Sequence, residues 1–311
     1  MEDTLNSHAP EEARAFVPGH ITGLFRIFDE RENPLYCGST GAGFCVTLGT
    51  HTKVEVVDHQ RLEIRTKYND KDMDARVTRT VVAKLAEDYG RTLKVTVEHE
   101  SHLPIGAGFG ASGAGALGTA LALGKILDPA LDPERAASVA HYAEVVNHTG
   151  LGDVIAQFKG GTEIRVQPGS PGIGVVTEFP VDASTVVVLA GASGLETSDI
   201  LTDPDGRSRI NQAGDQLISG LIENTSFEQF IRGAREFADA IQLKTPRVKL
   251  ALSELDAQGL TNSSMVMLGD SVFCFCDSSE VSTAKTLLER HWDKSEVFET
   301  TVSNDGGRLL N

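Results

Sequence analysis

A glycine-rich run, Leu103-Pro104-Ile105-Gly106-Ala107-Gly108-Phe109-Gly110-Ala111-Ser112-Gly113-Ala114, carries more information about this chain than any other segment. Its glycines permit backbone dihedrals that are closed to residues with a Cβ atom. The small apolar residues from Ala114 to Leu127 predict a buried helix directly after the run. A glycine-rich turn that opens a helix brings free backbone N–H groups and the positive end of the helix dipole together. The run therefore predicts an anion site, and the usual anion at such a site is phosphate.

Two widespread phosphate loops do not fit this run. The Gly108-x-Gly110-x-x-Gly113 spacing matches the dinucleotide fingerprint, but that motif needs a buried strand directly before it and an acidic residue about 20 residues later. Here the expected strand at residues 93–100 alternates apolar with polar residues, Pro104 interrupts its approach, and no acidic residue ends a second strand at that distance. The Gly-Lys-Ser/Thr of a Walker A loop and the loop motifs of protein kinases are also missing.

The order Pro-x-Gly-x-Gly-Phe-Gly-x-Ser-Gly-Ala at residues 104–114 resembles the phosphate loop of the GHMP kinases. This family includes galactokinase and the homoserine, mevalonate and phosphomevalonate kinases. Its usual pattern is Pro-x-Gly-x-Gly-Leu-Gly-Ser-Ser-Ala, so this chain keeps Ser112 and has Ala111 in place of the first serine. The resemblance implies an ATP-binding loop made of Pro104, Gly106, Ala107, Gly108, Phe109, Gly110, Ala111, Ser112 and Gly113.

Three further segments resemble motifs of the same family. Residues 16–25 resemble the N-terminal strand that ends in Ala-Pro-Gly-Lys, with His20 in place of the usual lysine or arginine. Residues 149–161 resemble the segment that carries the acidic catalytic residue, here Asp153, and keep the trailing Gly-Gly. Residues 259–273 resemble the C-terminal glycine-rich turn more loosely.

A narrower resemblance rests on three motif variants. Pro-Gly-His-Ile-Thr-Gly at 18–23, Cys-Gly-Ser-Thr-Gly-Ala-Gly at 37–43 and Ser-Met-x-Met-Leu-Gly-Asp-x-Val-Phe at 264–273 look like the pantoate kinases of archaea. This resemblance implies that ATP and Mg²⁺ serve to phosphorylate the small molecule pantoate on the route to coenzyme A. Homoserine, mevalonate or shikimate stay open as acceptors. Two other classes also stay open: an inactive sensor that binds ATP and a metabolite, and a module that binds proteins through an acidic face.

Each residue that the motifs single out has a functional and a structural interpretation. Asp153, in a Gly-x-Gly-Asp turn before a strand, is a catalytic base, an orienting carboxylate or a plain turn residue. Ser112 binds Mg²⁺ or caps its helix, and Glu144 is the second Mg²⁺ ligand or a surface glutamate. His20 donates a hydrogen bond to phosphate or to the pantoate carboxylate, or it packs structurally; a neutral histidine cannot replace the charge of a lysine.

The acceptor is expected to lie between two segments of small residues. The loop at 38–43 offers Ser39, Thr40 and Gly41 to an acyl acid, or is a tight turn. Asn262, Ser263 and Ser264 are expected to line the site from the second domain. Arg26, Arg207 and Arg209 are candidates for the acceptor's carboxylate, although each also fits a solvated surface charge.

Composition is typical of a soluble cytoplasmic enzyme. The 311 residues include 28 basic and 44 acidic side chains, a net charge of −16 that argues against nucleic-acid binding and fits a salt-rich cytoplasm. Long apolar runs are missing and the first 15 residues are acidic, so we expect neither membrane insertion nor a signal sequence. Cys37, Cys45, Cys274 and Cys276 lack a metal pattern, and the last two predict a buried thiol pair in a strand.

The resemblance implies an α+β fold of two domains, often found as a homodimer. We expect an acidic tail at 1–14, an ATP-binding domain at 15–182 like domain 2 of ribosomal protein S5, and a ferredoxin-like domain at 183–311. Patterning predicts a helix at 133–146 with Asp132 as its N-cap, and a hairpin at 49–66. It also predicts strands at 15–17, 43–57, 61–66, 93–100, 185–190, 271–276 and 296–302, and helices at 73–88, 208–222, 227–241, 245–258 and 280–291.

Overall fold

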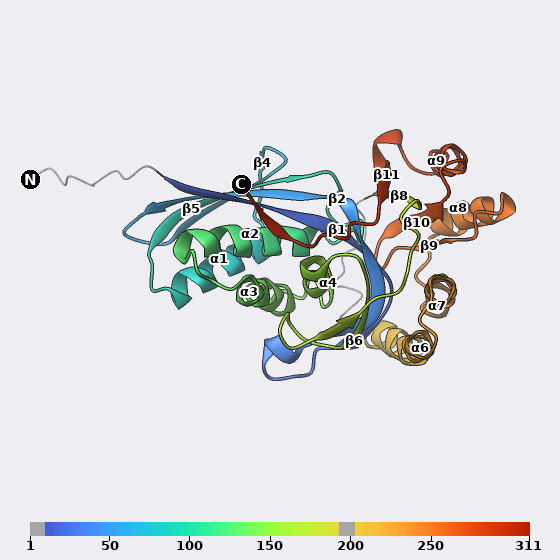
Figure 1. The fold of residues 1–311 in the computed structure, drawn as a ribbon, viewed down its shortest axis with the longest axis horizontal. Helices are drawn as coiled ribbons and strands as arrows, with labels where there is room; N and C mark the ends of the chain where they lie inside the picture. Colours follow the sequence, from blue (N-terminus) through green and yellow to red (C-terminus); the bar gives the residue numbers. More distant parts are fainter. Residues whose placement is uncertain (1–9, 193–202) are drawn as a thin grey trace, which may run out of the picture.

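The computed structural model describes residues 10–192 and 203–311, which form two α/β units that share one long pair of strands (Figure 1). The first unit is an eight-stranded sheet with helices α1 to α4 on one face. Its strands are β1 (Glu11–Phe28), β2 (Gly38–Asp58), β3 (Glu63–Tyr68), β4 (Lys71–Asp72), β5 (Leu93–Ser101), β6 (Thr162–Gln167), β7 (Val175–Thr177) and β12 (Arg308–Leu310). Its helices are α1 (Arg76–Asp88), α2 (Ala111–Leu127), α3 (Pro133–Val146) and α4 (Asp153–Lys159), and a 3₁₀ turn η1 (Pro34–Tyr36) lies between β1 and β2.

The second unit is a four-stranded antiparallel sheet packed against helices. It contains β8 (Val186–Ala192), β9 (Ser263–Met265), β10 (Asp270–Cys276) and β11 (Val297–Thr301), with α6 (Pro204–Glu223), α7 (Phe227–Ala240), α8 (Pro246–Ala257), α9 (Val281–Leu288) and the 3₁₀ turn η2 (Lys294–Glu296). The strand order β11-β8-β10-β9 is the fourth, first, third and second strand of this unit, which is the ferredoxin-like order. The predicted two-domain α+β fold is therefore confirmed.

The strands β1 and β2 hold the two units together. They are 18 and 21 residues long and pair antiparallel along almost their whole length. Register shifts at Pro18/Gly19 and Thr22/Leu24 mark bulges, which bend a strand without ending it. The part of the ribbon near residue 15 packs on α2 and shares a hydrophobic core with α1 and α3, whereas the part near Phe25 packs on α6 and α7. The bend thus lies where the two hydrophobic cores meet.

Three sequence expectations differ from this architecture. The hairpin at 49–66 is wrong, because β5 lies between β2 and β3; β3 joins β5 in parallel through the α1 crossover. Alternation identifies a strand but does not choose its partner, so the short turn at 58–62 was misleading. Strand β1 already begins at Glu11, inside the expected acidic tail, and continues far beyond Val17; residues 1–9 of that tail lie outside the described residues.

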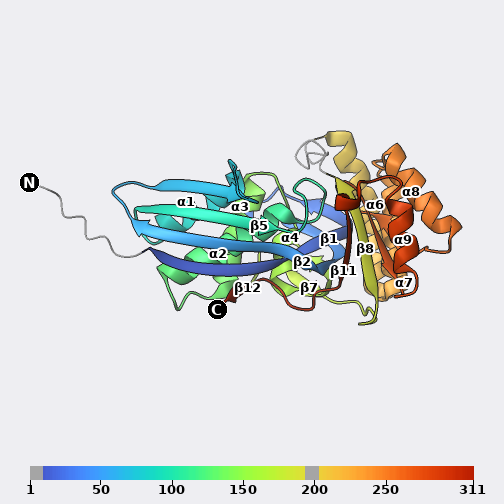
Figure 2. The same ribbon diagram turned by 90° about the horizontal axis from the view of Figure 1, so that it is seen from above.

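The C-terminal residues return to the first unit. Strand β12 pairs with β1, as Figure 2 shows, although we assigned all of 183–311 to the second domain. On the way, the Gly161 amide donates to the Ser303 carbonyl at 2.6 Å, and the Gly307 amide donates to the Gln157 carbonyl at 2.7 Å. Residues 303–307 therefore bind to helix α4 and to the turn that follows it, and the chain then continues into β12.

Several local predictions are confirmed. Helix α3 has the predicted bounds, and the Asp132 side chain accepts from the Glu134 amide at 3.0 Å. Cys274 and Cys276 are buried free thiols in β10 with their Sγ atoms 3.5 Å apart. No helix among residues 10–192 and 203–311 is long and apolar enough to cross a bilayer.

Candidate active site

The glycine-rich run forms a loop that opens helix α2. Gly106, Gly108 and Gly110 have φ of 77°, 80° and 68°, a region that residues with a Cβ rarely enter. The first helical hydrogen bond runs from the Ala114 amide to the Gly110 carbonyl at 2.9 Å. The amides just before Ala114 therefore face away from the helix and can bind an anion. Gly113 must be small as well, because a Cβ there would lie 2.7 Å from Oε1 of Gln157 on α4.

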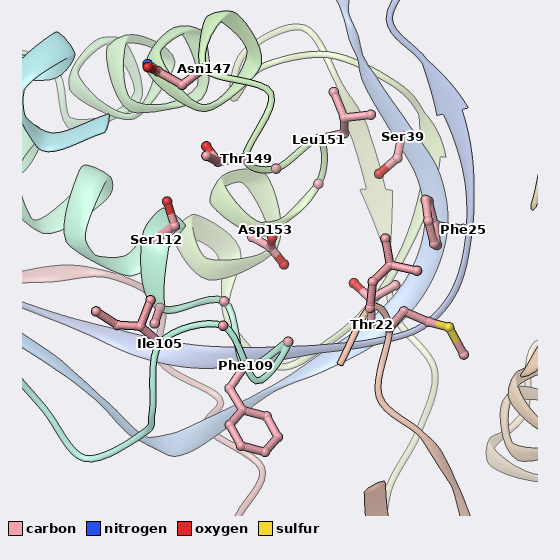
Figure 3. A pocket seen from close by; sticks show the side chains of 18 of the residues that line it. Thr22, Phe25, Ser39, Ile105, Phe109, Ser112, Asn147, Thr149, Leu151 and Asp153 are labelled. Atoms are coloured by element: carbon pink, nitrogen blue, oxygen red, sulfur yellow. The ribbon is translucent and has the colours of Figure 1, made fainter. Parts of the chain in front are cut away.

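A cavity of about 260 Å³ lies at the mouth of this loop. Figure 3 shows Ile105, Ser112 and Asn147 on one side of it, Thr22, Phe25 and Ser39 on the other, and Asp153 between them. The remaining lining residues are Arg76, Gly106, Gly108, Phe109, Gly110, Ala111, Thr149, Gly150, Leu151, Gly152, Arg165, Met267 and Leu268. Asp153 thus lies between the two ends of the cavity. The second unit contributes Met267 and Leu268 to the cavity wall.

Asp153 is the first residue of helix α4, whereas we expected a turn before a strand. The β-branched residues after it favoured a strand, but Gly152 packs where a side chain would collide with Ser39 Oγ and with Arg165 Nε, at 2.7 Å from the latter. Gly152 is the N-cap residue of α4, and the carboxylate of Asp153 points into the cavity (Figure 3). The side chain is 26 % exposed, so a bound molecule can reach it.

His20 is completely buried behind Asp153 and does not line the cavity. Its Nδ1 lies 2.7 Å from Asp153 Oδ1 and its Nε2 lies 3.0 Å from Glu163 Oε1. Burial alone would lower the pKa of His20, but Glu163 and Asp153 together raise it to about 9. His20 is therefore a cation at neutral pH, and the concern that a histidine here lacks the charge of a lysine does not hold.

The charge of His20 acts back on Asp153. Burial raises the pKa of the Asp153 carboxyl, but hydrogen bonding and charge from His20, with a contribution from Arg165, lower it overall. Asp153 is therefore ionised at neutral pH. Its second oxygen, Oδ2, lies beside Gly150, where only a glycine leaves room.

Glu144 is buried on α3 and is not a surface glutamate. Its Oε1 accepts from Ser112 Oγ at 2.5 Å and from Thr149 Oγ1 at 2.9 Å. Its Oε2 has no hydrogen-bond partner among the described residues and points at Gly150, as Asp153 Oδ2 does. Burial raises the pKa of Glu144 to about 7, with a further contribution from the Asp153 charge. The Ser112 hydroxyl thus donates to the Glu144 carboxylate and does not cap helix α2, whose N-cap residue is Gly110.

The expected loop at 38–43 is the start of strand β2. Ser39 lines the cavity, but Thr40 and Gly41 are not among the lining residues. Gly41 and Gly43 lie opposite Arg165 and Glu163 in the register of β2 with β6. A Cβ at Gly41 would collide with the Leu24 carbonyl on β1 and would lie 2.7 Å from Arg165 Nη2, so this glycine leaves room for both neighbouring strands.

Other expected residues lie elsewhere. Asn262, Ser263 and Ser264 do not line this cavity: Asn262 borders a separate hollow with Phe227 and Cys276, and the two serines are buried on β9. The physical reason is that β9 pairs with β10, so the chain reaches the cavity only three residues later. Arg26 and Arg207 form ion pairs with Asp215 and Asp29, and Arg209 Nε donates to the Ile241 carbonyl.

Arg76 and Arg165 are cationic residues that line the cavity. Sequence analysis singled out neither of them, nor Asn147 and Thr149. Arg165 is buried, pairs with Glu163, and keeps an Nε atom without a partner in the described part of the chain. A signal for it exists in the sequence. Glu163 and Arg165 alternate with Thr162, Ile164 and Val166 in a strand, so two opposite charges share one face.

Comparison with known proteins indicates the family of this chain. Residues 76–161 match the model of the GHMP kinases N terminal domain. The pantoate kinase of Thermococcus kodakarensis is 38% identical over 296 residues, 92% of this chain and 95% of that protein. The pantoate kinase of Methanocaldococcus jannaschii is 32% identical over 278 residues, 88% and 96% of the two chains. A solved structure described as a phosphotransferase related to the CoA biosynthesis pathway has a TM-score of 0.84 at 32% identity and covers 96% of this chain and 99% of its own.

The phosphate loop, the cavity and the fold define an ATP-dependent kinase of the GHMP type that acts on a small molecule. Within that superfamily, the chain belongs to the pantoate kinase family.

Proposed function

We propose that this enzyme transfers the γ-phosphoryl group of ATP to the primary hydroxyl of pantoate, in the cytoplasm and as a homodimer. The observation that carries the proposal is the position of Asp153, between the phosphate loop and a cavity wall that holds a buried arginine. Pantoate has a carboxylate close to its hydroxyl groups, so an acceptor site for it needs both a cation and a hydroxyl-binding carboxylate. The relatives named pantoate kinase support this choice of acceptor.

The triphosphate of ATP would lie on the amides of the loop 106–113. In an acidic protein, backbone amides supply positive potential without side-chain charge. Ile105 and Asn147, at the same end of the cavity, would contact the rest of the nucleotide. Arg76, at the start of α1, adds a cation on this side.

The residues at this end fit a magnesium ion. The unpartnered Glu144 Oε2 and the Ser112 hydroxyl are oxygen ligands of the kind that Mg²⁺ takes, and phosphate oxygens and water complete such a shell. The described residues contain no group of three or more His, Cys, Asp or Glu side chains that could hold a metal ion. Bound there, Mg²⁺ would neutralise phosphate charge that develops during transfer.

Asp153 would orient the acceptor hydroxyl and accept its proton. Its Oδ1 is occupied by His20, which leaves Oδ2 for the substrate. His20 is completely buried and does not line the cavity, so we assign it a positioning role in place of the substrate-binding role expected from the sequence. Its charge keeps Asp153 ionised, and an ionised carboxylate is the form that can accept a proton.

Arg165 would bind the pantoate carboxylate. Its guanidinium group is permanently charged and its Nε atom is unpartnered among the described residues. Ser39 lies next to it, on the same side of the cavity as Phe25. Burial of an arginine without full pairing is costly, and an acceptor carboxylate would supply the missing partner.

A coupled assay of ADP release tests the proposed function. We expect rapid ADP release with pantoate and Mg·ATP, and only slow release with homoserine, mevalonate or shikimate. If homoserine or mevalonate is the better acceptor, the family assignment holds and the acceptor assignment fails. If ATP binds tightly but no acceptor releases ADP, the chain is a sensor.

Replacement of Ser112 by alanine tests the metal-binding end. Loss of this hydroxyl removes a donor to Glu144 and an oxygen near the metal, so we expect the KM for Mg·ATP to rise about tenfold, the scale of one hydrogen bond to a charged group. The melting temperature should change little. Ser138→Ala, which removes a hydroxyl on α3 that donates to the Glu134 and Pro171 carbonyls, is the matched control and should keep the wild-type KM. An unchanged KM in Ser112→Ala would exclude Ser112 as a ligand.

A further inference from the structure

Glu163 is a buried carboxylate that the proposed reaction does not use. It is completely buried on β6 and is not among the cavity-lining residues. Its Oε1 atom is nevertheless a shared partner: it lies 3.0 Å from His20 Nε2 and pairs with Arg165 Nη1. Asp153, His20, Glu163 and Arg165 therefore form one continuous chain of charges from the α4 end of the cavity to its arginine wall.

The neighbouring strand is built to enclose this chain. In the register of β2 with β6, Gly43 lies opposite Glu163 and Gly41 lies opposite Arg165. A Cβ at Gly43 would lie 2.9 Å from His20 Nε2 and 3.0 Å from Glu163 Oε1. A Cβ at either glycine would also collide with a β1 carbonyl, that of Ile21 or Leu24, so β2 has no room for side chains between β1 and these charges. Glu163 is completely buried, and a carboxylate in such a place is stable only if its cationic partners stay with it.

We propose that Glu163 is the positioning residue that couples the two ends of the acceptor site, holding His20 against Asp153 and Arg165 toward the acceptor's carboxylate. The inference rests on the proposed function, because it assigns one end to the transferred hydroxyl and the other to the carboxylate of the same molecule. Glu163 itself touches no substrate. Through its Oε1 atom, Glu163 holds both His20, which positions Asp153, and Arg165, which binds the acceptor's carboxylate. It thereby fixes the distance between the two groups.

The pH dependence follows from the groups around His20. Asp153 contacts His20 from α4 and Glu163 contacts it from β6, where Glu163 also pairs with Arg165. Cys45 on β2 lies opposite His20 in the register of β1 with β2. The phosphate loop contributes only a backbone carbonyl, that of Phe109, which accepts from the His20 amide at 3.1 Å. Burial raises the pKa of the Cys45 thiol, so Cys45 is neutral. Glu163 and Asp153 are thus the two anions that keep His20 protonated against the effect of burial.

Removal of the Glu163 charge must therefore lower the pKa of His20, because burial then opposes a single remaining anion. His20 is protonated below its pKa and neutral above it. The alkaline limit of activity, set in the wild type by loss of this proton, should move to lower pH. At the other end, Arg165 loses its partner and its fixed orientation, so binding of the acceptor should weaken while binding of ATP does not.

The test is Glu163→Gln in the full-length enzyme, with kcat and both KM values measured from pH 6 to pH 10. We expect the KM for pantoate to rise about tenfold, the KM for ATP to stay within about twofold, and the alkaline limb of kcat to shift by about one pH unit or more toward acid. Glu178→Gln is the matched control, because it removes an exposed carboxylate that pairs with Lys159 on the same helix as Asp153. This control should keep the wild-type profile.

An unchanged pH profile with an unchanged KM for pantoate would overturn the proposal, and so would an equal rise in both KM values. If Glu163→Gln does not fold, NMR titration of labelled His20 in the wild-type protein decides. A ring that stays protonated above about pH 8 supports the coupling, and one that titrates near 6.5 contradicts it. This titration needs no substrate, so its outcome is separate from that of the proposed function, which fails if the wild type releases no ADP with pantoate.

Discussion

Asp153→Asn is expected to lower kcat by about three orders of magnitude while ATP still binds. The amide has nearly the shape of the carboxylate, so its oxygen can still accept from His20 and helix α4 keeps its position. It cannot accept a proton from the acceptor hydroxyl, and it removes the negative charge that pairs with His20. Coupled ADP release measures the loss of turnover, and calorimetric titration with ATP measures the retained binding.

The matched control for this variant is Asp182→Asn, an exposed aspartate that accepts from Ser184 at the start of the second unit. It should keep the wild-type kcat. Wild-type turnover in Asp153→Asn would remove Asp153 from the mechanism. Loss of ATP binding along with turnover would assign Asp153 to the nucleotide instead.

The phosphate loop and its helix could be predicted from sequence because their structure is local. Gly106, Gly108 and Gly110 are needed for their own positive φ angles, and Asp132 caps the helix that begins at the next residue. Nothing distant has to be known for such features. The family resemblance then extended the prediction to Asp153, which lines the cavity, and to Glu144, which is buried behind it with one oxygen next to Gly150.

The parts that sequence analysis missed depend on contacts between distant segments. Arg165 lines the acceptor end only because β6 pairs with β2, and because Gly41 stands opposite it. The sequence presents Gly41 as part of a loop, because the contacts that require a small residue there come from Leu24 on β1 and from Arg165 on β6. Ser263 and Ser264 were expected to line the site. They do not line this cavity, because the pairing of β9 with β10 buries them.

His20 shows how burial changes a chemical interpretation. As an isolated residue it is a weak substitute for lysine at neutral pH. Between Asp153 and Glu163 it holds its proton, so the charge that the family pattern calls for is present in another side chain. Its second partner, Glu163, follows in sequence 143 residues later, and no spacing rule connects the two.

Glu144→Gln is expected to lower kcat/KM for Mg·ATP by about two orders of magnitude at pH 8 without lowering the stability of the free protein. A neutral amide keeps the hydrogen bonds of Ser112 and Thr149 but is a poor magnesium ligand. Coupled ADP release at a series of Mg²⁺ concentrations measures the first effect. Thermal unfolding with and without Mg·ATP measures the second, because a ligand that binds only the native state raises the melting temperature.

The stability of the wild type, but not of this variant, should depend on pH through Glu144, in a direction set by burial. The pKa of Glu144 rises from 4.5 to about 7 in the folded protein, so folding favours the protonated form. This contribution is fully present below pH 4.5 and is lost as the pH rises through 7. The wild type without metal should therefore lose stability between pH 5 and pH 8 relative to Glu144→Gln, which carries no charge to bury.

Glu134→Gln, an exposed change in the first turn of the same helix, is the matched control for both measurements. It should keep the magnesium dependence and the pH profile of the wild type. If Glu144→Gln also keeps the magnesium dependence of the wild type, the metal lies elsewhere in the cavity. If it loses activity and is also less stable at pH 8, Glu144 serves the fold. Lost activity together with retained stability would indicate that Glu144 binds the metal ion. In the free enzyme the buried charge of Glu144 does not stabilise the fold, so its removal costs activity alone.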